Sequence, residues 1–209
     1  MSDKAFPDAA AQWNQRYAGD EFLFGREPNA YLCAQAHHLP PRGRVLCVAD
    51  GEGRNSVWLA RQGHAVEAFD VSDLAVAKAR VLAAEAGAGV SFHVADCESW
   101  PWQAGSHDAV VGIFIQFVGP AERERLFARM AAALKPGGVL VLLGYGPAQL
   151  VYKTGGPGEL SHLYTPGLLR EAFAGLRVVD LVEYEADLQE GTRHVGRSAL
   201  VGLVARRPA

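Results

Sequence analysis

The sequence is short of the features that mark secreted, membrane-spanning and polyanion-binding proteins. Its 209 residues include only three cysteines, and 23 acidic residues against 20 basic ones leave a formal charge of -3. This near balance gives no reason to expect a nucleic-acid partner. No apolar run approaches the roughly 20 residues of a membrane helix, and the polar N-terminus lacks a signal-peptide core. We therefore expect a cytoplasmic protein that binds neither nucleic acid nor membranes.

The cysteines also exclude two kinds of scaffold. Cys33, Cys47 and Cys97 lie far apart and form neither a disulfide framework nor a Cys-x-x-Cys motif. Cys33 and His37 have the spacing that places two metal ligands on one helix face, but no further ligands cluster with them. We interpret this stretch as a half-buried surface helix and expect no metal.

Short apolar runs alternate with helical patterns, which is the main signal that is present. The runs predict strands at 44–49, 65–70, 90–95, 108–115 and 138–145. One helix between them is capped by Ser72 or Asp73 and ends before Gly87; its predicted apolar face is Leu74, Ala77, Val81 and Ala84. Another begins at Pro120, is stopped by residues 135–138, and carries Leu126, Met130 and Leu134 on one face. Such alternation with continuously apolar strands indicates a parallel sheet covered on both faces.

The two ends of the chain differ from this pattern. Two helices are expected around Trp13 and Tyr31, and a further one at 166–173. Two extended segments, 176–188 and 196–208, follow with no helix between them and predict an antiparallel hairpin. We expect a single domain over 1–209, with an N-terminal helical segment at 1–42 and a sheet core at 43–209.

A glycine-rich turn, "VLCVADGEGRN", follows the first predicted strand. Gly51 and Gly53 fit the first two positions of a dinucleotide-binding fingerprint, but Ser56 occupies the third, so an NAD ligand is only one reading. Asp70 ends the second strand, where an acid accepts both hydroxyls of an adenosine ribose. Asp96 ends the third strand, in position to accept a bond from an adenine amino group or simply to cap its own loop. The turn therefore predicts an adenosine-containing ligand.

Several stretches together resemble one family, the class I S-adenosylmethionine-dependent methyltransferases, and in particular the small bacterial branch that includes the tellurite-resistance methyltransferases. These stretches are "WNQRY", "FLFGREPNAYL", "VLCVADGEGRNSVWLA", "AFDVS", "HVADCESW" and "LKPGGVLVLLGY". The resemblance implies an α/β fold, a doubly wound, seven-stranded Rossmann-like sheet that is mostly parallel with the last strand antiparallel. It implies S-adenosyl-L-methionine as cofactor and S-adenosyl-L-homocysteine as product. The resemblance also implies that the segment 1–42 acts as a lid. The chain departs from the family at Cys47, where an acid is common, and at Ala49, where the first glycine stands. Either Asp50 substitutes for that acid, or backbone carbonyls and the N-terminal helix hold the methionine ammonium.

The implied function is in-line methyl transfer to a small-molecule acceptor. A cofactor-binding protein of the same fold without turnover is the alternative, and an NAD-binding oxidoreductase a weaker one. Residues 113–117 lack the Asn/Asp-Pro-Pro-aromatic motif of enzymes that methylate nucleic-acid amines. We expect a monomer or homodimer.

The predicted site residues fall into three sets. The cofactor set is Tyr17, Asp50, Gly51, Glu52, Gly53, Asn55, Asp70, Val71, Asp96, Cys97 and Ile113. The acceptor set is Trp13, Arg16, Phe24, Gln116, Tyr145 and Tyr152. The candidates for a catalytic base are Tyr17, His162 and His194.

Overall fold

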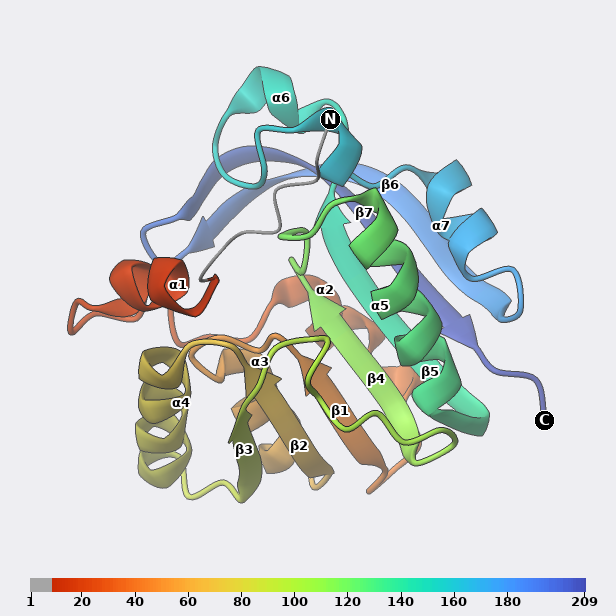
Figure 1. Cartoon of the computed structure of the whole chain (residues 1–209), viewed down its shortest axis with the longest axis horizontal. Helices are drawn as coiled ribbons and strands as arrows, with labels where there is room; N and C mark the ends of the chain where they lie inside the picture. The colour runs from red at the N-terminus through yellow and green to blue at the C-terminus, as the bar shows by residue number, and fades with distance from the viewer. Residues whose placement is uncertain (1–8) are drawn as a thin grey trace.

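A seven-stranded sheet with the strand order β3-β2-β1-β4-β5-β7-β6 is the centre of the molecule (Figure 1). The computed structural model describes residues 9–209; residues 1–8 of the predicted lid segment lie outside them. The strands are β1 (Arg44–Val48), β2 (Ala65–Asp70), β3 (Val90–Val94), β4 (His107–Ile113), β5 (Leu134–Tyr145), β6 (Arg177–Glu190) and β7 (His194–Arg206). The first five strands in this order, β3, β2, β1, β4 and β5, pair in parallel, and β7 is antiparallel to both β5 and β6. The predicted fold class and terminal hairpin are confirmed.

Helices occupy the connections between the strands. They are α1 (Ala9–Tyr17), α2 (Ala30–Gln35), α3 (Arg54–Arg61), α4 (Asp73–Glu85), α5 (Pro120–Ala133), α6 (Gln149–Tyr152) and α7 (Pro166–Ala172), with 3-10 turns η1 (Ala36–His38) and η2 (Leu160–His162). Figure 1 shows α5 in front of β4 and β5, and α1 and α6 beyond the end at which the parallel strands finish. That end is where ligands bind in open α/β sheets.

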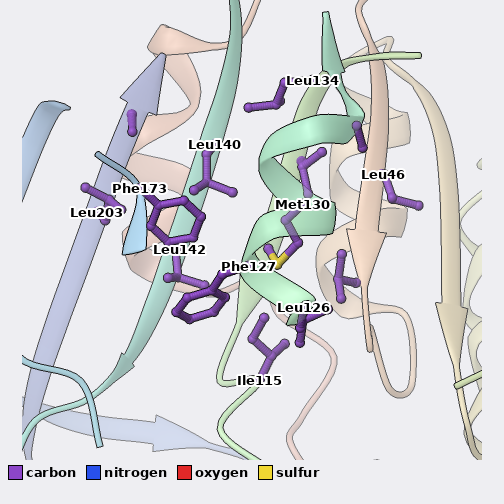
Figure 2. Packing of buried hydrophobic residues seen from close by; sticks show 14 of the residues in the cluster. Leu46, Ile115, Leu126, Phe127, Met130, Leu134, Leu140, Leu142, Phe173 and Leu203 are labelled. Atoms are coloured by element: carbon purple, nitrogen blue, oxygen red, sulfur yellow. The ribbon is translucent and has the colours of Figure 1, made fainter. Parts of the chain in front are cut away.

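Alternate residues of the strands face opposite sides of the sheet and build two cores. Leu46 and Val48 of β1 face the layer of α5 and α7, whereas Val45 and Cys47 face α2 and α3. Figure 2 shows the first core, in which α5 lies against β5 and β7 through Phe127, Met130, Leu140, Leu142 and Leu203. Cys47, at the position where the family commonly carries an acid, is therefore a fully buried core residue.

The predicted buried face of α4 was wrong. Leu74, Ala77, Val81 and Ala84 all lie toward solvent, and the buried positions are Ala75, Val76, Ala79, Leu82 and Ala83. The reason is close packing: a Cβ on Gly53 would lie 2.7 Å from the Cβ of Ala79, so only a small side chain fits where α4 meets the turn. The helix is consequently turned so that Leu74 and Val81 face solvent, while Val76 and Leu82 are buried beside Ala79.

The predicted end of α5 also needs correction. Leu126 and Met130 are buried as expected, but Leu134 has extended backbone and begins β5. Its side chain remains in the same core because β5 runs directly beneath the helix.

The terminal hairpin is longer than the strand on which it rests. Tyr145 of β5 pairs with Leu200, yet β6 and β7 continue pairing to Glu190 and His194. Figure 1 shows this extension arching over the sheet end toward α1. The Thr192 backbone N–H at its tip donates to the Leu23 carbonyl oxygen over 3.0 Å. The hairpin tip and the N-terminal segment thus meet above the ends of the parallel strands.

Candidate functional site

A cavity of about 1100 Å³ opens at this end of the sheet, between the strand ends, α1 and the hairpin tip. The predicted residues that line it are Trp13, Arg16, Tyr17, Phe24, Asp50, Gly51, Glu52, Asn55, Asp70, Val71, Asp96, Cys97, Ile113, Gln116, Tyr145, His162 and His194. Predicted site residues from distant parts of the sequence therefore lie around one cavity. Gly53 and Tyr152 are not in the lining.

The glycine turn is shaped by left-handed backbone. Ala49, Gly51 and Gly53 have φ values of 47°, 62° and 88°. A Cβ on Gly51 would lie 2.9 Å from the Tyr17 hydroxyl, so glycine allows α1 to close over the turn. Gly53 instead allows the start of α3 to pack against α4, which corrects its predicted role as a ligand contact.

Asp70 is held at the end of β2 by two backbone donors. Its Oδ2 accepts a hydrogen bond from Gly51 N and its Oδ1 one from Ser72 N, both over 2.9 Å. Burial raises the pKa of Asp70 to about 6, outweighing these two bonds, which favour the ionised form. The carboxylate is fixed in direction and retains free acceptor positions at the cavity wall.

Asp50 is a second acid at the same turn. It accepts the hydroxyl of Ser56, and its pKa is raised to about 7 by burial, with a smaller contribution from the charge of Asp70. Neither Asp50 nor Asp70 takes part in an ion pair within residues 9–209. Two desolvated carboxyls without a cationic partner make this wall favourable for a positively charged ligand.

Glu52 lines the cavity, but its charge is already paired. Lys78 Nζ lies 2.9 Å from its Oε1, and Phe24 N donates to its Oε2 over 3.4 Å. The Lys78 ammonium also donates to the Glu21 carbonyl oxygen over 2.8 Å. Glu52 therefore ties the N-terminal segment to the turn.

Two further predicted residues also serve their own loops. Asn55 Oδ1 accepts Asn29 N over 2.9 Å. Asp96 Oδ1 accepts the backbone N–H groups of Glu98 and Ser99, each over 2.7 Å, and these bonds lower its pKa. Asp96 thus caps its loop while one edge of it lines the cavity.

Aromatic rings form the opposite wall. The Phe24 ring centroid lies 6.2 Å from that of Tyr17 and 4.6 Å from that of His194. Phe114 stacks on Tyr145 at 4.7 Å and meets His194 at 4.5 Å. Phe114 has a φ of 59°, an uncommon conformation for a bulky residue. Sequence reasoning missed it because nothing in 113–117 distinguishes Phe114 from an ordinary buried aromatic.

His194 belongs to a buried charge network. Its Nδ1 lies 3.2 Å from Glu190 Oε2, and Arg54 Nη2 lies 2.8 Å from the same oxygen. Asn29 Nδ2 donates to Glu190 Oε1 over 2.7 Å. Burial alone would raise the pKa of Glu190, but the bond with His194 and the Arg54 charge lower it to about 2. Burial also lowers the pKa of His194, outweighing Glu190.

Tyr17 is unsuited to proton abstraction. Burial raises its pKa well above its usual value, and the charges of Asp70, Glu52 and Asp50 raise it further. The phenol therefore stays protonated and serves as a cover of the turn, stacked on Trp13 at 5.6 Å.

Comparison with known proteins agrees with this arrangement. A family model described as a methyltransferase domain matches residues 45–138. A ubiquinone biosynthesis O-methyltransferase of Xanthomonas axonopodis pv. citri is 34% identical over 165 residues, which are 78% of this chain and 69% of that protein. The chain belongs to the class I S-adenosylmethionine-dependent methyltransferases.

Other relatives of this methyltransferase are longer. An uncharacterised protein of Mycobacterium tuberculosis is 29% identical over 150 residues, and the chain spans 54% of its length. Among solved structures, one described by the conversion of a disulfide bond into a thioacetal group during echinomycin biosynthesis has a TM-score of 0.77 at 20% identity, covering 95% of this chain and 89% of that one. TehB from Haemophilus influenzae has a TM-score of 0.71 at 16% identity, covering 95% and 66%. These structures share the fold.

Two residues of the predicted acceptor set, Gln116 and Tyr152, form hydrogen bonds within the protein. Gln116 Nε2 donates to the carbonyl oxygens of Tyr145 and His162, over 2.9 and 3.0 Å, and its Oε1 accepts Tyr145 N. Its amide is used to fasten β5 to η2. Tyr152 lies outside the cavity, where its hydroxyl donates to Glu185 over 2.6 Å. Tyr152 thus lies apart from the cavity, whereas Gln116 lines it while fastening β5 to η2.

Metal-binding clusters and membrane-spanning helices are both absent from residues 9–209. Within residues 9–209 there is no group of three or more His, Cys, Asp or Glu side chains placed to hold a metal ion. No helix in the same range is both long enough and apolar enough to cross a membrane.

Proposed function

We propose that this protein transfers a methyl group from S-adenosyl-L-methionine to a small-molecule acceptor, leaving S-adenosyl-L-homocysteine. The observation that carries the proposal is a pair of acids, the half-buried Asp50 and the buried Asp70, that face the cavity without an ion-pair partner among residues 9–209. S-adenosyl-L-methionine has an ammonium and a sulfonium, whereas NAD places a pyrophosphate at this turn, where Asp50 would repel it.

The residues fit distinct parts of the cofactor. Asp70 is suited to the ribose hydroxyls, since its direction is already fixed by Gly51 and Ser72. Asp50 is suited to the ammonium, in place of the acid that the family commonly has at position 47. The adenine side would be bounded by Val71, Asp96, Cys97 and Ile113, which line that part of the cavity.

When bound, the cofactor supplies an electrophilic methyl group on a sulfonium. The chain's own contribution is to exclude water and align the acceptor. Tyr17 and Trp13 cover the turn, and Phe24 closes the gap between α1 and the hairpin. We propose that the N-terminal segment acts as a lid and that Trp13, Arg16, Phe24 and Tyr145 bound the acceptor.

An oxygen acceptor is supported by the Xanthomonas relative, whose name describes O-methyl transfer. The enclosed site also favours a small molecule over a nucleic acid, because α1 and the hairpin tip join above it.

Calorimetry with S-adenosyl-L-methionine, S-adenosyl-L-homocysteine and NAD tests the proposal. Both sulfur compounds should bind, and Asp70→Ala should weaken their binding by about 1 to 3 kcal/mol because the ribose hydroxyls lose a charged partner. Asp108→Ala is the matched control: Asp108 also accepts a backbone N–H, that of Arg44 over 2.8 Å, and pairs with Lys135 at 2.9 Å, outside the cavity. Tight binding of NAD alone, or unchanged affinity in Asp70→Ala, contradicts the proposal.

A further inference from the structure

His194 stands at the junction of three elements that face the cavity. The ring comes from β7, contacts Phe24 of the N-terminal segment and Phe114 of the loop after β4, and lies edge-on to Tyr145 at 5.6 Å. The titratable or charged groups against it are Glu190, Arg54 and Tyr145. Only 10% of the side chain is exposed, and that surface lines the cavity.

The network fixes which nitrogen of His194 is free to take a proton. A carboxylate only accepts hydrogen bonds, so Nδ1, at 3.2 Å from Glu190, carries the hydrogen and Nε2 is left with its lone pair. Burial lowers the pKa of His194 despite Glu190, and the charge of Arg54 lowers it further, so the ring stays neutral. His194 is thereby oriented as a neutral base.

Tyr145 offers a donor beside it. Its side chain is 1% exposed, its ring lines the cavity, and its buried hydroxyl has no hydrogen-bond partner within residues 9–209. A Cβ on Gly155 would lie 2.8 Å from that hydroxyl, so the backbone of the loop 153–159 covers the oxygen and must shift before a ligand can reach it. A buried donor without a partner costs about 1 to 3 kcal/mol, which a ligand oxygen would recover.

We propose that the methyl acceptor is a hydroxylated aromatic compound and that His194 Nε2 removes the proton of its hydroxyl. We propose further that the Tyr145 hydroxyl donates to the same oxygen once the loop 153–159 has shifted away from it. The inference rests on the proposed function. The oxygen–methyl bond forms as the methyl–sulfur bond breaks, the electron pair of that bond stays on the sulfur of the uncharged product, and the proton ends on His194. Glu190 and Arg54 are positioning residues.

The chemistry of the walls selects this acceptor class. A phenol has a pKa of about 10 and needs a base near neutral pH, whereas a thiol needs little help. The Phe24 and Phe114 rings can receive an aromatic ring in offset or edge contact. The site therefore combines a base, an unpaired hydroxyl donor and two aromatic side chains, which together suit a hydroxyl group on an aromatic ring.

The test measures transfer of labelled methyl by the full-length chain to simple phenols, with catechol as the first probe, and to thiophenol. His194→Gln should lower kcat/KM for catechol about 100-fold or more. It should leave cofactor affinity within about threefold and should remove the acidic limb of the pH profile measured at saturating cofactor. Added imidazole should restore part of the catechol rate in His194→Ala, a response that a structural histidine would not give.

The chain offers matched controls for both residues. His107 is also buried and lies 3.2 Å from a glutamate, Glu67, but outside the cavity, so His107→Gln should keep the rate of the folded protein. Tyr145→Phe should lower kcat/KM for catechol about tenfold, whereas Tyr164→Phe, which removes another buried hydroxyl without a partner, should not.

The possible failures are distinguishable. Loss of cofactor binding in the wild-type chain overturns the proposed function and this inference with it. Cofactor binding with transfer to thiophenol alone, or to none of the phenols, overturns only the inference. Equal catechol rates in wild type and His194→Gln do the same.

Discussion

At the scale of single residues, Ala49 is in a conformation that favours glycine. Its φ of 47° lies in the left-handed region, which costs a residue with a Cβ roughly 1 to 2 kcal/mol. The family resemblance places a glycine there, and Ala49 lines the cavity beside the turn. The chain therefore keeps the turn geometry at a small cost in stability.

Ala49→Gly should leave the free energy of unfolding unchanged or raise it by up to about 1 kcal/mol. Relief of strain is partly offset by the greater freedom of glycine in the unfolded chain. Thermal unfolding with Ala60→Gly as control checks this, because Ala60 lies within α3 and its replacement should cost about 1 kcal/mol. A clear loss of stability in Ala49→Gly would show that the backbone of Ala49 is not strained.

Site residues could be predicted from sequence where a local rule applied. Asp70 and Gly51 follow from the rule that ligands meet parallel strands at their carboxyl ends. Arg54 and Glu190 could not be found in this way, since they are 136 positions apart and only tertiary packing joins them. The sequence predicted that Gln116 lies at the cavity, but it gave no sign that the amide bonds to backbone groups of β5 and η2, because those partners are 29 and 46 positions away.

At the scale of elements, the contact between the hairpin and the N-terminal segment depends on two glycines. A Cβ on Gly191 would overlap the Leu23 carbonyl and the Gly25 backbone, and one on Gly25 would lie 3.0 Å from Gly191 N. The two backbones touch directly. Strand periodicity predicted the hairpin, but it contains no information on this contact, because glycines at a turn are common in any hairpin.

Gly191→Ala should separate the two elements and weaken cofactor binding. Gly87→Ala is the control, since Gly87 has a φ of 62° against 60° for Gly191 but no atom within 4 Å of the added Cβ. Both variants share the backbone strain, so any further loss in Gly191→Ala measures the contact. Limited proteolysis should cut its N-terminal segment faster; equal cleavage in the two variants would show that the contact does not hold the lid.

At the scale of the whole molecule, the two acids couple cofactor binding to pH. Their folded pKa values, about 7 for Asp50 and about 6 for Asp70, are raised mainly by burial above the usual 3.8. The folded chain thus binds more protons than the unfolded chain between about pH 4 and 7, and ligand-free stability should fall as pH rises through that range.

A cationic cofactor favours the ionised acids, so binding near pH 6 should release protons and affinity should rise toward pH 8. Titration calorimetry in buffers of different ionisation enthalpy measures the release directly. Asp50→Asn should remove much of it, and the same proton count in wild type and Asp50→Asn would contradict the assigned role of Asp50.

The bond between Asn29 and Glu190 spans 161 positions of the chain. During synthesis on the ribosome, the first strands and their helices emerge long before Glu190 and His194 exist, so the aromatic wall stays open to water until β6 and β7 have left the exit tunnel. Non-local pairing of this kind is also slow to form. In the nascent chain, Phe24 and Phe114 consequently remain exposed to water for a period. During this period the chain is most accessible to chaperones and most prone to aggregation.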